Sequence, residues 1–457
     1  MDLFGTAGIR GSVTDTVTPT LALSVGRAAA VDGAEFVVAR DGRETGPALA
    51  AAVEAGLESG GARVRRAGQL PTPALAYASQ GRRGIMVTAS HNPPTDNGLK
   101  LFVDGQEYDS IAENRIEERV ADDPDPVEWN EWGDSTTVDV LSNYRETVIG
   151  YAEEFGSALD GLRVVVDCGN GTASVATPQV LRALGADVVA LNASVDGHFP
   201  GRESKPTPET LEDLLEFVRA GEFDLGIGHD GDADRIVIVA EDGSIVHEDT
   251  VLAILAEHYV ARSDVSDPVV VTTPNASARI DERVRAAGGR VERVHLGGLH
   301  EGIAEVRATA EEQGATDETS VVFAAEPWKH IHPALGGWID GIASAAVFSR
   351  LVATDGLAAL REPVTERPYR KVSIDCPDEH KGEVMATLEA RLPEQFPEAS
   401  VSTAYGVRLE WPDASWVLVR PSGTEPYVRL YAESDDVDAL VEDANAVIER
   451  AVEETTT

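Results

Sequence analysis

Lysine and cysteine are scarce in this chain, and long apolar runs are missing. Two cysteines, Cys168 and Cys376, are too few for a disulfide framework or a cysteine-based zinc site. No run approaches the roughly 18 apolar residues that a membrane span needs. The first residues also lack the basic and then apolar segments of a signal peptide. We therefore expect a protein of the reducing cytoplasm that is neither secreted nor inserted in a membrane.

Positive charge is also in short supply. The 79 acidic residues outnumber the 38 basic ones, which gives a formal net charge of −41, and only five of the basic residues are lysines. A polyanion of this kind repels nucleic acid, so nucleic acid is excluded as a partner. Because the acidic residues are spread along the chain, we interpret the surface as halophilic, adapted to salt that screens self-repulsion. An ordinary acidic enzyme is the alternative.

What the sequence does contain is a core-forming, repeated pattern. Apolar residues make up 42% of the 457 positions, enough for about three or four domains. The segments 35–68, 162–192 and 268–295 share one order of an apolar strand, a polar turn, a helix, a glycine and a second strand. This order predicts parallel α/β sheets and three similar domains, although any α/β protein can show it.

Polar stretches that contain proline divide the chain further. They lie at 121–132, 261–268 and 361–368. The expected domains are 1–135, 136–255, 256–362 and 363–457. The last is smaller and combines an alternating strand with a helix from about residue 437 to 452.

A serine follows one of the predicted buried strands. Ser90 stands in the loop Thr88–Pro94, directly after the apolar run Ile85–Val87. Open α/β sheets bind ligands at the carboxyl ends of their strands. The loop therefore indicates either a positioned hydroxyl that accepts a transferable group or a turn with a capping serine.

Three aspartates alternate between two further apolar runs. Asp230, Asp232 and Asp234 can converge on one hard cation, and without it their repulsion is unfavourable. An EF-hand is not expected, because Arg235 occupies the position that needs glycine and a strand follows. We predict a Mg²⁺ site, with a solvated acidic turn as the alternative.

A third loop, near the end of the chain, has the composition of an anion cradle. Arg420–Pro426 combines arginine with serine, glycine and threonine, and Arg429 follows on the next strand. Such a loop fits a phosphate, or else it is a plain turn. The glycine-rich segment around Arg10 and the turn Arg40–Arg43 are weak signals on their own.

Taken in order, the serine, triple-aspartate and terminal Arg-Pro-Ser-Gly-Thr loops resemble those of the α-D-phosphohexomutase family over essentially the whole chain. The resemblance implies three similar mixed-sheet α/β domains and a smaller C-terminal α+β domain around a central cleft. It implies a phosphoglucomutase or phosphomannomutase that acts on a phosphosugar through a phosphoserine, with Mg²⁺ and a sugar 1,6-bisphosphate intermediate. Phosphoglucosamine mutase is the first alternative. A Mg²⁺-dependent phosphatase with an aspartate nucleophile and a non-catalytic phosphosugar-binding protein are the others.

The resemblance also assigns residues to roles. Ser90 would be phosphorylated and would hold the metal together with Asp230, Asp232 and Asp234. The residues expected to act on the reacting phosphoryl group are Arg10, His91, Lys100, Arg235 and His330. The residues expected to bind the sugar and its second phosphate are Glu326, Arg420, Ser422, Gly423, Thr424 and Arg429.

One loop departs from the family pattern Gly-Glu-x-Ser-Gly-His. Here Trp328 replaces the serine and Lys329 the second glycine, while Glu326 and His330 match. Trp328 is either a packed loop aromatic or a platform on which a sugar stacks. The preferred sugar, and the choice between monomer and dimer, therefore stay open.

Overall fold

The structure is a computed structural model that describes residues 3–5, 8–423 and 425–456. The chain forms two compact units, and each is built from two separate stretches of sequence. The first unit comprises Met1–Glu248 and Trp328–Leu360, and the second comprises Asp249–Pro327 and Arg361–Thr457. In the described parts of the chain, no helix combines the length and the apolar character that crossing a bilayer requires.

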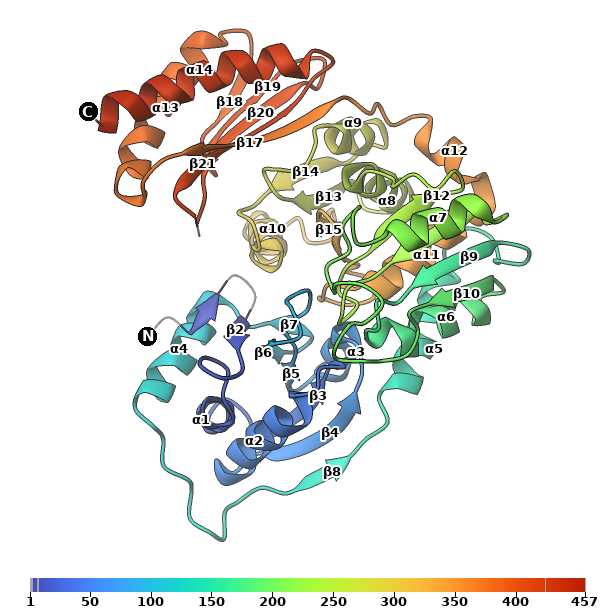
Figure 1. Cartoon of the computed structure of the whole chain (residues 1–457), viewed down its shortest axis with the longest axis vertical. Helices are drawn as coiled ribbons and strands as arrows, with labels where there is room; N and C mark the ends of the chain where they lie inside the picture. Colours follow the sequence, from blue (N-terminus) through green and yellow to red (C-terminus); the bar gives the residue numbers. More distant parts are fainter. Residues whose placement is uncertain (1–2, 6–7, 424, 457) are drawn as a thin grey trace. The chain divides into compact units, whose positions relative to one another are not determined.

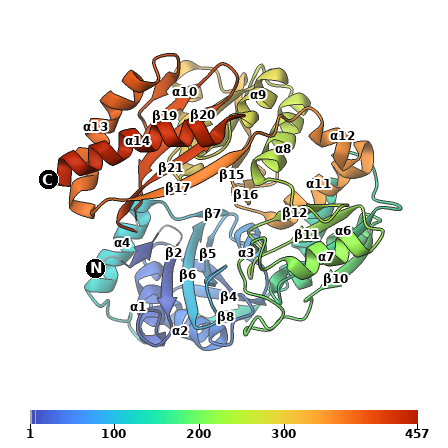
Figure 2. The ribbon, with the colours of Figure 1, turned by 45° about the horizontal axis from the view of Figure 1, so that its top comes forward.

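The first unit begins with a large mixed sheet (Figure 2). Its strands are β1 (Phe4–Gly5), β2 (Gly8–Ser12), β3 (Glu35–Arg40), β4 (Arg63–Gln69), β5 (Arg83–Val87), β6 (Asp96–Val103), β7 (Gln106–Glu107) and β8 (Ser135–Thr137). They follow the order β1-β2-β6-β5-β3-β4-β8, with β7 on β6. Strand β3 is parallel to β4 and β5, whereas β6 runs antiparallel to β5 and β2.

Helices enclose this sheet. They are α1 (Pro19–Ala30), α2 (Gly46–Ser59), α3 (Thr72–Ala78) and α4 (Ser110–Ala121). Helices α1 and α2 pack against each other, and α2 also lies on β3 (Figure 1). The core between them consists of apolar side chains such as Phe36, Val53, Leu57 and Ile85, all fully buried. Their burial supplies the main driving force for this layer.

A second sheet completes the first unit. It has the order β10-β9-β11-β12, formed by β9 (Arg163–Asp167), β10 (Asp187–Leu191), β11 (Leu225–Gly228) and β12 (Val237–Ala240). Only β12 is antiparallel to its neighbour. The other elements here are α5 (Leu141–Ala152), η1 (Thr172–Val175), α6 (Thr177–Ala183), α7 (Glu212–Ala220), β16 (Lys329–Ile331), α11 (Gly341–Asp355) and α12 (Leu357–Arg361).

Helix α11 comes from the returning stretch of chain. It packs on α5 and α6, and its residues from Gly341 to Val352 are buried. Asp340 caps its first turn by accepting hydrogen bonds from the backbone N–H groups of Ile342 and Ala343. The same carboxylate accepts a hydrogen bond from the Tyr144 hydroxyl at 2.9 Å. The cap therefore fixes both the start of α11 and its contact with α5.

The second unit contains a three-layer part and a two-layer part. The first has parallel strands in the order β14-β13-β15, formed by β13 (Asp267–Thr272), β14 (Arg290–Arg293) and β15 (Thr319–Glu326), with helices α8 (Glu248–Arg262), α9 (Arg279–Ala286) and α10 (Leu299–Gln313). The other is an antiparallel sheet, β17-β21-β20-β19-β18, covered on one face by α13 and α14 (Figure 1). Its elements are β17 (Tyr369–Asp375), η2 (Asp378–His380), α13 (Lys381–Gln395), β18 (Ser400–Ser402), β19 (Val407–Glu410), β20 (Trp416–Pro421), β21 (Tyr427–Glu433) and α14 (Val437–Thr456).

The repeat predicted from sequence is confirmed. Each repeated segment forms a strand, a helix and a second strand parallel to the first, namely β3-α2-β4, β9-α6-β10 and β13-α9-β14. In each sheet the third parallel strand lies on the other side of the first, as β5, β11 and β15 do. The mixed α/β architecture with a smaller C-terminal α+β part is therefore as expected. Helix α14 continues beyond the predicted end, to Thr456.

Candidate active site

Ser90 lies in the loop between β5 and β6 of the first unit. Its side chain is fully buried, and its backbone has φ +50°, the left-handed conformation that a residue with a Cβ seldom adopts. The hydroxyl donates a hydrogen bond to Oδ2 of Asp230 at 2.6 Å. Nδ1 of His91 lies 3.3 Å from the same hydroxyl. The serine is therefore held in one orientation, and a turn with a capping serine does not describe it.

The three aspartates lie in the loop between β11 and β12. Asp230, Asp232 and Asp234 each place a carboxylate oxygen within 4.8 Å of the other two, and all three are buried. Oδ1 of Asp232 and Oδ1 of Asp234 have no hydrogen-bond partner among the residues that the structure describes. Buried carboxylate oxygens that lack donors fit a hard cation such as Mg²⁺. A solvated acidic turn is wrong for this loop, because water does not reach it.

Two basic side chains border the aspartates. Nζ of Lys100 lies 3.0 Å from Asp234 and 3.3 Å from Glu107, and the lysine is almost fully buried. Nε of Arg235 lies 3.7 Å from Asp230 and 3.8 Å from Asp234. The loop therefore combines three carboxyl groups with two basic side chains in a largely buried space.

These charges shift the pKa values of Asp230 and Asp234 in opposite directions. Burial, followed by the negative charges of Asp234 and Asp232, raises the pKa of Asp230 well above its ordinary value. Burial acts in the same direction on the pKa of Asp234, but the positive charges of Lys100, Lys329 and Arg235 outweigh it and lower that pKa. Lys329, which departs from the family pattern, thus contributes to the electrostatics of the aspartate loop.

His91 lies close enough to Arg235, Arg10 and Asp234 for their charges to act on its imidazole. Burial and the positive charges of Arg235 and Arg10 lower the pKa of His91 to about 3. His91 is therefore neutral near pH 7, and its ring can accept or donate a hydrogen bond. Arg10 stands on β2 directly opposite Gly98 of β6.

His330 and Trp328 lie on the returning segment of the first unit. His330 is buried, Oγ of Ser344 lies 3.0 Å from its Nδ1, and burial lowers its pKa to about 3. Trp328 packs against the apolar cluster that includes Val165, Leu211 and Val239. Of the two interpretations of Trp328, the packed loop aromatic describes it better than a sugar-stacking platform.

The expected phosphate loop lies in the second unit. Arg420 of β20 stands opposite Arg429 of β21, and the guanidinium of Arg420 contacts the Tyr431 hydroxyl at 3.1 Å. Nη2 of Arg429 lies 3.0 Å from the Glu425 carboxylate. Two arginines therefore lie on adjacent strands beside this loop, and one of them is paired with a carboxylate of the loop.

Ser422 and Gly423 continue that loop. Ser422 is buried, and its backbone N–H donates to the carbonyl of Tyr427 at 3.0 Å. Gly423 follows it, and a Cβ at this position would meet nothing within 4 Å. Thr424 lies outside the described residues. Glu326 ends β15 in the same unit.

Four buried polar residues near Ser90 were missed from the sequence. Asp41, Arg43, Thr72 and Thr88 are all buried. The hydroxyls of Thr72 and Thr88 lie 2.7 and 3.1 Å from Oδ2 of Asp232. The one sequence feature that could have indicated them is the polar turn Arg40–Arg43 after a strand. The residues that this turn contacts are distant in the sequence, so their contacts could not be predicted.

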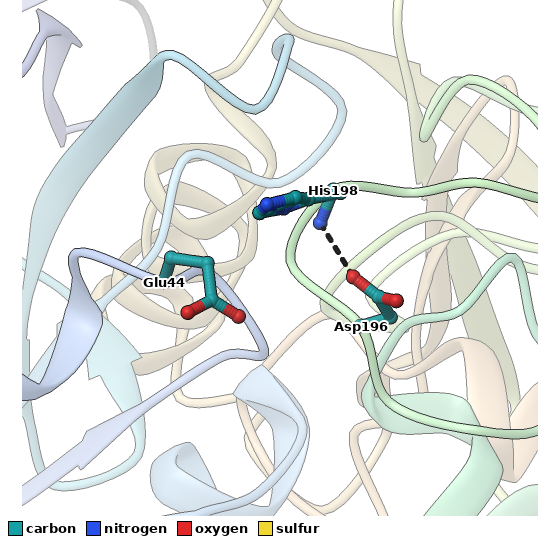
Figure 3. A group of neighbouring side chains, drawn as sticks. All are labelled: Glu44, Asp196 and His198. Carbon is teal, nitrogen blue, oxygen red and sulfur yellow. Dashed lines mark hydrogen bonds between the residues drawn. The ribbon is translucent and has the colours of Figure 1, made fainter.

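A second acidic group lies nearby, at the surface of the first unit. Glu44, Asp196 and His198 bring potential metal-ligating atoms within 4.8 Å of one another (Figure 3). Glu44 and His198 are exposed, and the drawn hydrogen bond joins the His198 backbone N–H to Asp196 at 2.9 Å. Exposed groups of this kind are common in so acidic a chain, and we assign no ion to them.

Comparisons with known proteins identify relatives of this chain. The phosphoglucomutase/phosphomannomutase family models match in three parts: α/β/α domain I over residues 1–126, α/β/α domain II over 144–243, and the C-terminal domain over 376–450. A phosphopentomutase of Thermococcus kodakarensis is 40% identical over 469 residues, which cover 99% of each chain. A probable phosphoglucosamine mutase of Methanopyrus kandleri is 40% identical over 465 residues, covering 99% of this chain and 98% of that one.

A solved structure supports the same conclusion. The crystal structure of a phosphoglucomutase/phosphomannomutase family protein from Burkholderia thailandensis has a TM-score of 0.84 at 28% identity, covering 99% of this chain and 97% of that one. Sequence and fold therefore correspond over the full length of the chain. The chain belongs to the phosphoglucomutase/phosphomannomutase family.

Proposed function

We propose that this protein is a phosphosugar mutase that moves a phosphoryl group between two hydroxyls of a sugar through phosphorylated Ser90. The proposal rests above all on the Ser90 hydroxyl, which lies 2.6 Å from Asp230 inside a buried group of three carboxylates. Family membership and the relatives named as phosphopentomutase and phosphoglucosamine mutase support it.

The chemical step is a pair of phosphoryl transfers. The oxygen of the sugar's free hydroxyl forms a bond to phosphorus while the bond to Ser90 Oγ breaks, and a sugar bisphosphate results. In the second half, the other phosphoryl group returns to Ser90, and a sugar phosphate with exchanged positions leaves. In the first transfer the sugar hydroxyl loses a proton and the Ser90 oxygen gains one, and the second transfer reverses both changes. We propose His330, which is neutral near pH 7, as the group that takes up the sugar's proton.

The metal requirement follows from the aspartates. Asp230, Asp232 and Asp234, with an oxygen on Ser90, would hold Mg²⁺. When bound, Mg²⁺ would neutralise charge on the phosphoryl oxygens. Lys100 and Arg235 supply fixed positive charge at the same loop.

The other phosphate of the sugar needs a separate anchor. We propose that Arg420, Ser422, Gly423, Thr424 and Arg429 provide it, with Glu326 accepting hydrogen bonds from sugar hydroxyls. Arg420 and Arg429 support this assignment, because two arginines on neighbouring strands suit a doubly charged phosphate. Arg10 and His91 would contact the transferred group.

The preferred sugar is identified by assaying a panel of sugar 1-phosphates. Glucose, mannose, glucosamine and pentose 1-phosphates are each supplied with Mg²⁺ and the matching bisphosphate, and the product is measured in a coupled assay. The proposal expects turnover of at least one of them. If none turns over and Ser90 is never phosphorylated, a phosphosugar-binding protein without catalysis replaces it.

A phosphatase with an aspartate nucleophile makes a different prediction. Its trapped phosphoenzyme is an acyl phosphate, which hydroxylamine cleaves, whereas phosphoserine resists hydroxylamine. Because the Ser90 hydroxyl points at the aspartates, we expect the resistant form.

The proposal also includes the domain organisation, the location and the oligomeric state of the protein. We propose four domains with the boundaries expected from sequence, and a cytoplasmic location that agrees with two buried free cysteines. The enzyme works as a monomer or a dimer.

A further inference from the structure

The strongest feature outside the assigned residues is the guanidinium of Arg43. This side chain is fully buried and belongs to the turn after β3. Its donors serve five acceptors: Asp41 Oδ2 at 3.0 Å, and the backbone carbonyls of Ser90 at 2.9 Å, Asn92 at 2.8 Å, Pro93 at 2.6 Å and Asp96 at 2.9 Å. One side chain therefore holds the backbone of the serine loop at four points.

Asp41 positions this guanidinium and connects it to the other side of Ser90. Its Oδ1 accepts the backbone N–H of Arg43 at 3.0 Å, and its Oδ2 accepts the Thr88 hydroxyl at 2.7 Å. Oγ1 of Thr88 in turn accepts the backbone N–H of Ser90 at 2.9 Å. Arg43 thus bonds the Ser90 carbonyl directly, and Asp41 acts on the Ser90 N–H through Thr88.

These contacts oppose a conformational cost. Ser90 has φ +50°, which is unfavourable for any residue with a Cβ and needs surrounding structure to maintain it. Its carbonyl accepts hydrogen bonds from Arg43 and from the Ser204 hydroxyl, the latter at 2.8 Å. If these donors were lost, the peptide would relax and the hydroxyl would turn away from Asp230.

Only arginine suits this position. The guanidinium is planar and has five donors in a fixed fork, whereas the lysine ammonium is a compact charge with three. A lysine at this position would keep the charge opposite Asp41 but could not reach four carbonyls spread over seven residues. The requirement is therefore for geometry and not for charge alone.

We propose that Arg43, oriented by Asp41, is a positioning residue that keeps Ser90 aimed at the aspartate loop. Its guanidinium is fully buried and bonded to protein acceptors, and it acts through the backbone of the serine loop. The inference rests on the proposed function of Ser90.

The test compares Arg43→Lys with Arg350→Lys. Arg350 is also buried, lies on α11 of the same unit, and donates to the carbonyls of Gly156, Glu153 and Phe155, outside the serine loop. Both variants lose a buried forked donor to backbone carbonyls. Each full-length protein is assayed for kcat, KM, phosphate incorporation into Ser90 from the sugar bisphosphate, and amide exchange over residues 88–97.

Arg43→Lys is expected to lower kcat and the rate of Ser90 phosphorylation roughly 100-fold. KM should stay within about threefold, and amides in 88–97 should exchange roughly tenfold faster. Arg350→Lys should leave kcat and that exchange at wild-type levels. Equal losses in the two variants, or unchanged exchange over 88–97 in Arg43→Lys, would overturn the inference.

Asp41→Asn and the wild-type protein extend the test. If Arg43→Lys does not fold, Asp41→Asn replaces it, because the isosteric amide removes the charge that orients Arg43. Wild-type kcat and exchange in Asp41→Asn would then overturn the inference. Wild-type protein without mutase activity would refute the proposed function, and amide exchange over 88–97 in Arg43→Lys would then still show whether Arg43 holds the serine loop.

Discussion

The hydroxyl oxygen of Ser90 lies 2.6 Å from Oδ2 of Asp230, although 140 residues separate them in the chain. The two side chains come from loops at the ends of strands in different sheets, β5 and β11, within one compact unit. The hydroxyl that we propose is phosphorylated and the carboxylates that suit a metal therefore lie in one site. Substitutions at either residue should impair the same step.

Removal of the serine hydroxyl tests that step directly. Ser90→Ala should lower mutase turnover at least about 10⁴-fold and abolish phosphate incorporation from the sugar bisphosphate, because the hydroxyl proposed to carry the phosphoryl group is removed. The thermal unfolding midpoint should stay close to that of the wild type. Mutase activity at the wild-type level would contradict the phosphoserine mechanism.

Neutralising one aspartate should weaken metal binding without weakening the fold. Asp232→Asn keeps an oxygen for the Thr72 hydroxyl but removes one of three buried carboxylates. We expect the Mg²⁺ concentration for half-maximal activity to rise at least about tenfold. In EDTA the unfolding midpoint should be equal or higher, since repulsion falls.

Asp187→Asn, an exposed carboxyl on β10, is the control for this experiment. Its Mg²⁺ titration should match that of the wild type. Identical titrations of Asp232→Asn and the wild type would mean that the loop is structural.

Removal of the expected phosphate anchor should raise KM much more than it lowers kcat. Arg420→Ala should raise KM for the sugar phosphate roughly 10- to 100-fold, because a charge-assisted contact to the phosphate is removed. Its kcat should change less than about threefold. Arg370→Ala, exposed on β17, should leave KM as it is. An unchanged KM in Arg420→Ala would locate the anchor elsewhere.

Acid should destabilise the protein through its buried neutral histidines. Burial, followed by the effect of His330, lowers the pKa of His332 to about 3, so the ring stays neutral when folded and protonates near pH 6.5 when unfolded. The unfolded state then binds more protons, and the free energy of unfolding falls as the pH drops from about 6.5 toward 3. The expected slope is about 1.4 kcal/mol per pH unit for each such group.

His332→Gln isolates this contribution, because glutamine can still hydrogen-bond Ser344 but does not titrate. Between pH 7 and 5, its loss of unfolding free energy in urea should be about 1–2 kcal/mol smaller than that of the wild type. If the variant and the wild type lose the same amount, His332 protonates readily in the folded state.

Salt should stabilise so acidic a chain. With a formal net charge of −41, raising KCl from 0.1 to 1 M shortens the screening length from about 10 to 3 Å and relieves self-repulsion. The unfolding midpoint should rise over that range. Equal midpoints at the two concentrations would leave an ordinary acidic enzyme as the better description.

The sequence predicted the repeated strands because apolar runs such as Val164–Val166, bounded by glycine and polar turns, have few other stable structures. It also predicted the serine and aspartate loops, since their residue types limit the chemistry that they can perform. It could not predict that Arg43 holds Ser90, because these residues lie 47 positions apart and meet only through packing. The burial of His330, likewise, follows from the position of α11.

The return of residues 328–360 to the first unit affects how the protein is made. Helix α11 packs on α5 and α6, yet the ribosome delivers it about a hundred residues after the last strand of that unit's second sheet. Until α11 has been synthesised, the surfaces of α5 and α6 that it covers stay exposed on the nascent chain. Translation must therefore pass residue 355 before this half of the enzyme can reach its native state, and a truncated product is expected to be a client of chaperones or proteases.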